Sequence, residues 1–88
     1  LAAFFATRND IRLVLVGHTD SVGALDFNIA LSKRRAASVR MRLLDVYGLD
    51  ASRIEAEGNG YLAPIKSNLD SAGRSANRRV EVVVLPLN

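Results

Sequence analysis

The chain contains no cysteine and no tryptophan, and its aromatic residues are limited to two tyrosines and three phenylalanines among 88 residues. Without cysteine it can form neither a disulfide nor a thiolate metal site. No uninterrupted apolar run approaches the roughly 20 residues of a membrane-spanning helix, so we expect any membrane attachment to lie in segments outside this chain. The few aromatic rings offer little stacking surface for bases, and we expect no nucleic-acid partner.

The charge balance is mildly basic, with twelve basic and nine acidic residues and a net charge of +3. Arginines cluster at Arg34, Arg35, Arg40, Arg42 and Arg78–Arg79. On composition alone, such clusters are more often solvated faces or ion pairs than polyanion-binding surfaces. With 49% hydrophobic and 24% charged residues, the composition is that of a globular protein, and the length predicts one small domain over residues 1–88.

The pattern of apolar residues predicts the order helix, strand, helix, strand, short helix, strand. Residues 1–6 and 26–47 repeat apolar residues at helical spacing, and Gly48 is a natural end for the longer helix. Residues 11–16, 53–57 and 79–84 alternate, which predicts strands with one buried and one wetter face.

Two apolar faces are expected from this periodicity. In the first strand one face carries Ile11, Leu13 and Leu15, and the other carries Arg12, Val14 and Val16. In the long helix the expected core stripe is Phe27, Leu31, Val39, Leu43 and Tyr47, and we place Phe4, Phe5 and Phe27 in the core.

A strand, a long helix and a second strand joined by short loops predict a parallel crossover. Because each strand has one wetter face, the helices should cover one side of the sheet only. We therefore expect an α/β (α+β) fold, a two-layer sandwich of a small mixed sheet with helices on one face.

Two charged residues stand out as candidate ligand contacts. Asp20 lies just past the carboxyl end of the first strand, where binding residues commonly lie. Arg35 falls on the expected apolar stripe of the long helix, so its guanidinium must be paired or lie at the edge of a cavity. An internal bridge to Asp20 would satisfy it, as would a zwitterionic amino-acid ligand, whose carboxylate suits arginine and whose ammonium suits aspartate.

Three sequence blocks occur in a recognisable order: Gly17-His18-Thr19-Asp20-Ser21, Asn28-Ile29-Ala30-Leu31-Ser32-Lys33-Arg34-Arg35-Ala36 and Gly73-Arg74-Ser75-Ala76-Asn77-Arg78-Arg79-Val80. Together they resemble the OmpA C-terminal-like domain, the module of peptidoglycan-associated lipoproteins and flagellar MotB stators. The family fold begins with one further strand, and no such segment precedes Leu1. Either the sheet lacks that strand or it is completed otherwise. A three-stranded sheet would leave an unpaired edge that favours contact with another chain, a homodimer being one such contact.

The resemblance also implies a function and a set of contacts. Domains of this family grip the meso-diaminopimelate of the peptidoglycan stem peptide noncovalently, and Asp20 and Arg35 match the main charged contacts. Thr19, Asn28 and Leu31 match nearby pocket positions, and Arg78 matches a position near the pocket, either as a contact or as a brace for Asp20. The implied role is a periplasmic wall anchor for an outer- or inner-membrane protein. The alternative is a structural or protein-interaction domain of the same fold.

Enzymatic readings of the same residues are weaker. His18, Ser21 and Asp20 could form a hydrolytic relay, but neighbours in one strand and loop rarely converge. His18 and Asp20 alone are too few ligands for a metal site. The turn Gly58-Asn59-Gly60 does not lead into a helix N-terminus, as a phosphate-binding loop would. We therefore expect neither enzymatic activity nor a metal or cofactor.

Overall fold

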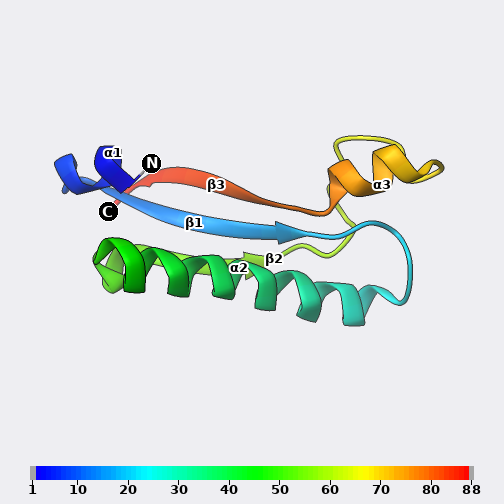
Figure 1. The fold of residues 1–88 in the computed structure, drawn as a ribbon, viewed down its shortest axis with the longest axis horizontal. Coiled ribbons are helices and arrows are strands. Elements are labelled where there is room, and N and C mark those ends of the chain that lie inside the picture. The colour runs from blue at the N-terminus through cyan, green and yellow to red at the C-terminus, as the bar shows by residue number, and fades with distance from the viewer. Residues whose placement is uncertain (1, 88) are drawn as a thin grey trace.

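A computed structural model describes residues 2–87 of the chain (Figure 1). Its elements are α1 (Ala2–Thr7), β1 (Ile11–His18), α2 (Leu25–Tyr47), the 3-10 helix η1 (Ala51–Arg53), β2 (Ile54–Gly58), α3 (Ser71–Asn77) and β3 (Arg79–Pro86). The expected order of helices and strands is confirmed, although the first and last strands extend two residues further than predicted. Leu1, placed in the first helix by the sequence, lies outside the described residues.

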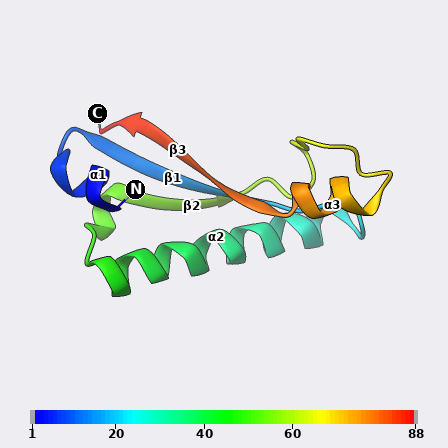
Figure 2. The ribbon, with the colours of Figure 1, turned by 45° about the horizontal axis from the view of Figure 1, so that its top comes forward.

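The strands form one mixed sheet in the order β2-β1-β3. β1 and β2 are parallel, with Leu13 beside Ile54, and β1 and β3 are antiparallel, with Leu13 beside Val84. α2 connects the two parallel strands and packs along one side of the sheet (Figures 1 and 2). The predicted parallel crossover and two-layer α/β arrangement are therefore confirmed. Within residues 2–87, β2 and β3 each pair only with β1 and form the two edges.

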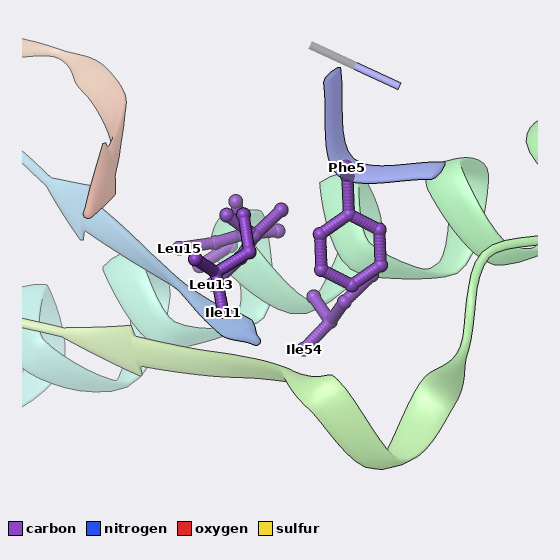
Figure 3. Close-up of a cluster of buried hydrophobic side chains, with 6 residues drawn as sticks. Phe5, Ile11, Leu13, Leu15 and Ile54 are labelled. Carbon is purple, nitrogen blue, oxygen red and sulfur yellow. The ribbon is translucent and has the colours of Figure 1, made fainter. Parts of the chain in front are cut away.

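The core lies between β1, β2 and the helices (Figure 3). The alternation of β1 is confirmed, because Ile11, Leu13 and Leu15 are buried whereas the side chains between them are partly exposed. Phe5 of α1 and Ile54 of β2 complete this apolar layer together with Ala36 of α2. Burying each of the larger side chains contributes about 1.5–3 kcal/mol, so this small set supplies much of the stability of the fold.

The predicted apolar stripe of α2 is wrong in part: Leu31 and Leu43 are half-buried, and Leu43 packs against the core as expected, but the other three residues do not. Phe27, Val39 and Tyr47 are exposed, and the helix instead buries three small or polar side chains: Asn28, Ser32 and Ala36. Phe4, also expected in the core, is exposed. The buried face of α2 is therefore rotated away from the face that apolar periodicity indicated.

Close approach of the strands explains this rotation. A Cβ atom added at Gly17 would lie 2.0 Å from the Ser32 carbonyl oxygen, and one added at Gly58 would lie 2.4 Å from the Lys33 amide nitrogen. These glycines let the ends of β1 and β2 touch the backbone of α2, which leaves no room for large side chains in between. Small residues consequently occupy the inner face of the helix at this end.

Of the helices in residues 2–87, none combines the length and the apolar composition that crossing a membrane requires.

Candidate functional site

The chain leaves β1 through a short segment with a fixed backbone. The Thr19 amide donates to the Gly60 carbonyl at 2.8 Å, and the Thr19 hydroxyl donates to the Asp20 carbonyl at 2.8 Å. Thr19 and Asp20 are both largely buried. The strand end and the turn after β2 therefore fix the backbone that carries Asp20.

The Asp20 carboxylate accepts two hydrogen bonds. The Val22 amide donates to Oδ1 at 3.0 Å, and Nη1 of Arg78 donates to Oδ2 at 2.6 Å. The Val22 amide, and next the Arg78 guanidinium, lower the pKa of Asp20, so this carboxyl is ionised at neutral pH. Arg78 thus braces Asp20, one of the two roles that the sequence left open for it.

Asn28 fastens the loop after Asp20 to the first turn of α2. Its Nδ2 donates to the Val22 carbonyl at 2.9 Å and to the Ala24 carbonyl at 3.0 Å. Asp20 and Asn28 therefore hold the same residue, Val22, one through its amide and the other through its carbonyl. Because Asn28 is buried and its amide nitrogen is engaged, its visible role is to shape the loop.

Arg35 is exposed on α2, about two turns beyond Asn28. Within residues 2–87 its guanidinium has neither a hydrogen bond nor an ion pair, and the carboxylate of Asp20 is paired with Arg78 instead. The prediction that Arg35 interrupts the buried stripe of the helix is therefore wrong, because the buried face of α2 passes through Ala36 instead. The guanidinium is nevertheless available to a ligand, and the half-buried Leu31 lies one turn before it.

Two fully buried polar residues, Ser32 and Asn77, have structural roles that the sequence did not predict. The Ser32 hydroxyl accepts from the Gly60 amide at 2.9 Å and donates to the Ile29 carbonyl at 2.8 Å. Asn77 makes four hydrogen bonds to the loop before α3, with Ile65, Lys66 and Asn68. Periodicity could not reveal these roles, although the position of Asn77 directly before two arginines was a usable signal.

His18 is buried at the end of β1, and neither ring nitrogen has a hydrogen-bond partner in the described part of the chain. Its nearest carboxylate is Glu81 of β3, 3.8 Å from Nε2, and not Asp20. Burial lowers the pKa of His18, with a further lowering by Arg79 and an opposing effect of Glu81. No hydrogen-bonded relay therefore links His18 to Ser21 or Asp20 within residues 2–87.

Two surface hollows lie away from Asp20 and Arg35. One of about 330 Å³ is lined by Lys66, Ser67, Asp70, Ala72, Gly73 and Ala76. The other, of about 280 Å³, lies where α1 meets the end of α2. The Asp70 carboxylate in the first hollow is already engaged, since it accepts from the Gly73 amide at 2.6 Å and caps α3. Neither hollow brings together the opposite charges that Asp20 and Arg35 supply.

The protein is a small α+β domain with β1 at the centre of its sheet. Just past the end of β1 lies the Asp20 carboxylate, braced by Arg78, and domains of this kind commonly carry binding residues at such a strand end. The sequence profile of the OmpA family matches residues 1–78, and the chain belongs to that family. The resemblance noted from the three sequence blocks is thereby confirmed.

The chain is also similar to individual proteins of this family. Outer membrane protein A of Bordetella avium is 48% identical over 73 residues, which are 83% of this chain and 37% of that protein. The chain therefore spans only about a third of that relative. The crystal structure of the peptidoglycan-associated lipoprotein of Burkholderia pseudomallei is 30% identical, with a TM-score of 0.87 over 96% of this chain and 70% of that one.

A further solved structure is the cell wall anchor of the type VI secretion system (T6SS) of Pseudomonas aeruginosa. It is 31% identical, with a TM-score of 0.76 over 97% of this chain and 60% of that one. The α+β fold of this chain is thus shared with a peptidoglycan-associated lipoprotein and with a cell wall anchor. The fold class predicted from the sequence is confirmed.

Proposed function

We propose that this chain is a noncovalent peptidoglycan-binding domain that anchors an envelope protein to the cell wall from the periplasm. The proposal rests on two opposite charges that are open to a ligand: the ionised Asp20 carboxylate, which Arg78 braces, and the exposed Arg35 guanidinium, which has no partner within residues 2–87. Support also comes from two similar structures, those of a peptidoglycan-associated lipoprotein and of a cell wall anchor. This is a binding role and needs neither a cofactor nor a catalytic group.

The ligand group that fits these charges best is the free end of diaminopimelate in the stem peptide. Its ammonium would donate to Asp20, whose two oxygens together offer about four lone-pair sites and use two of them for Val22 and Arg78. Its carboxylate would accept two parallel hydrogen bonds from the planar guanidinium of Arg35. The expected ligand is therefore an amino acid that carries a free ammonium and a free carboxylate on one carbon.

The remaining residues of the proposed site have different roles. Thr19 and Asn28 are buried and would shape the loop that carries Asp20, while the half-buried Leu31 would offer apolar contact to the ligand. Arg78 braces Asp20 through one nitrogen, yet 44% of its side chain is exposed. Arg78 is therefore positioned to contact a ligand that approaches Asp20.

The alternative function is a protein-interaction domain of the same fold. It is favoured by one observation, the solvent exposure of Val82, Val83 and Val84 on the edge strand β3. Such an edge can add a strand from another chain, and a homodimer would be the simplest product. In that case Asp20 would only hold Arg78 and the loop, and sacculi would not bind.

Cosedimentation with purified peptidoglycan sacculi tests the proposal. Wild-type protein should pellet with sacculi, while Asp20→Asn and Arg35→Gln should each reduce the affinity at least tenfold, since losing one charged partner costs about 2 kcal/mol or more. Arg34→Gln is the matched control, because Arg34 is exposed on the same helix and carries the same charge. Failure of the wild-type protein to pellet, or equal pelleting of all variants, would reject the proposed site.

A further inference from the structure

The middle of α2 carries an unusual excess of positive charge. Five basic residues fall between residues 33 and 42, and no acidic residue separates Asp26 from Asp45. Arg40 donates to the carbonyls of Ile54 and Ala51. The other four are exposed and have neither a hydrogen bond nor an ion pair from their side chains within residues 2–87: Lys33, Arg34, Arg35 and Arg42.

Helix geometry places two of these four on one flank. Arg35 and Arg42 are seven residues apart, which corresponds to about 10.5 Å along the axis and a rotation of only about 20°. Arg34 points about 100° away from Arg35. Val39 lies between Arg35 and Arg42 on the same flank and is 37% exposed. The flank of Arg35, Val39 and Arg42 is hereafter the basic flank.

The basic flank faces away from β2 and toward the side of β3. Lys33 and Arg40 mark the opposite flank, since the Lys33 backbone approaches Gly58 of β2 and Arg40 donates to the Ile54 carbonyl. β1 lies between β2 and β3 in the sheet (Figure 2). The flank opposite to Lys33 and Arg40 therefore lies toward β3.

On that side the helix leaves part of the sheet uncovered. Val82 and Val84 pair with Leu15 and Leu13, so they share the helix-facing side of the sheet with those buried leucines. They are nevertheless 41% and 47% exposed, because α2 packs on β1 and β2. An accessible apolar strip of Val82 and Val84 on β3 therefore lies on the side of the sheet toward which the basic flank faces.

We propose that Arg42, with Val39 beside it, is a second subsite for the wall peptide and binds another carboxylate of the stem whose diaminopimelate contacts Asp20 and Arg35. This inference rests on the proposed function. The spacing of about 10.5 Å equals about three residues of extended peptide, so one stem can span both arginines. Stem peptides are acidic and carry small apolar side chains between their carboxylates, which matches cations separated by a valine.

Calorimetric titration with a soluble diaminopimelate stem peptide, and separately with free diaminopimelate, tests the subsite. Arg42→Gln should weaken stem-peptide binding by about three- to fivefold, the upper part of the range for one solvent-exposed ion pair. It should leave the affinity for free diaminopimelate unchanged, because that ligand cannot reach Arg42. Arg34→Gln, which removes the same charge from a different face, should change neither affinity by more than about twofold.

The outcomes separate the subsite from the site itself. Equal weakening by Arg42→Gln and Arg34→Gln would mean that only the overall charge matters and would overturn the subsite. An unchanged affinity of Arg42→Gln for the stem peptide, together with strong losses in Asp20→Asn and Arg35→Gln, would overturn the subsite and leave the proposed function intact. Wild-type affinity in Asp20→Asn and Arg35→Gln would reject the proposed function.

Discussion

Replacing Asn77 by alanine should destabilise the domain and loosen the loop before α3. The Asn77 side chain is fully buried, and its Oδ1 accepts from the amides of Ile65 and Lys66 at 2.9 and 3.0 Å. Its Nδ2 donates to the Lys66 carbonyl and to Oδ1 of Asn68 at 2.9 and 2.8 Å. Since each hydrogen bond contributes about 1 kcal/mol net, losing four should lower the free energy of unfolding by about 3–4 kcal/mol.

A loss of that size is a large part of the 5–15 kcal/mol typical of small domains. Urea unfolding followed by circular dichroism measures it, with Ser75→Ala, an exposed position on α3, as the control. Asn77→Asp should be no more stable than Asn77→Ala, because its second carboxylate oxygen would face the oxygens of Lys66 and Asn68. A loss below about 1 kcal/mol for Asn77→Ala would refute the role assigned to this network.

Two further predictions concern the strand ends near the site. Gly58→Ala should cost at least about 2 kcal/mol of stability, because the added Cβ would overlap the backbone of Lys33, whereas Gly48→Ala should cost about 1 kcal/mol through its positive φ of 62° alone. The free energy of unfolding should fall as the pH drops below about 6.5, since burial lowers the pKa of His18 and the unfolded chain therefore binds the proton more readily. The contribution of this one proton is at most about 1.4 kcal/mol per pH unit and should be absent in His18→Leu.

Denaturant unfolding measures both effects. Equal stability losses for the two glycine variants would show that close packing of β2 on α2 does not limit the residue at position 58. For His18, the wild-type protein and His18→Leu are compared between pH 7.5 and 5. Parallel pH dependences would mean that the histidine titrates similarly in the folded and unfolded states.

Helices and strands could be predicted from the sequence where a single local pattern determines the structure. Alternation placed Ile11, Leu13 and Leu15 on the buried face of β1, and the short connections to the long helix predicted the parallel pairing with β2. These features follow from local patterns and from the geometry of chain connections. Both predictions are confirmed because no unusual tertiary contact opposes these local patterns in this part of the sheet.

The inner face of α2 could not be predicted in the same way. Apolar periodicity favoured Phe27 and Val39, but the close approach of Gly17 and Gly58 makes the inner surface accept only small residues such as Ser32. The decisive quantity is the distance between helix and strand, which depends on residues far apart in the chain. A glycine at the end of each neighbouring strand was the available signal.

The candidate site was predicted in part. Asp20 lies at the strand end as expected, but its ion-pair partner is Arg78, 58 positions further along the chain, whereas Arg35 is exposed. A charge pattern identifies which residues are unusual, but it does not say which opposite charge lies within reach. Only the return of β3 alongside β1, with Arg79 opposite His18, brings Arg78 next to Asp20.

The central claim is that Asp20 and Arg35 together recognise the ammonium and the carboxylate of diaminopimelate. Calorimetric titration of the wild-type protein with two stem peptides that differ only in carrying diaminopimelate or lysine tests it most directly. Lysine lacks the terminal carboxylate and would leave Arg35 unpaired, so we predict at least about tenfold weaker binding, or about 1.4 kcal/mol. Equal affinity for the two peptides would contradict the claim and assign recognition to the glycan or to the peptide backbone.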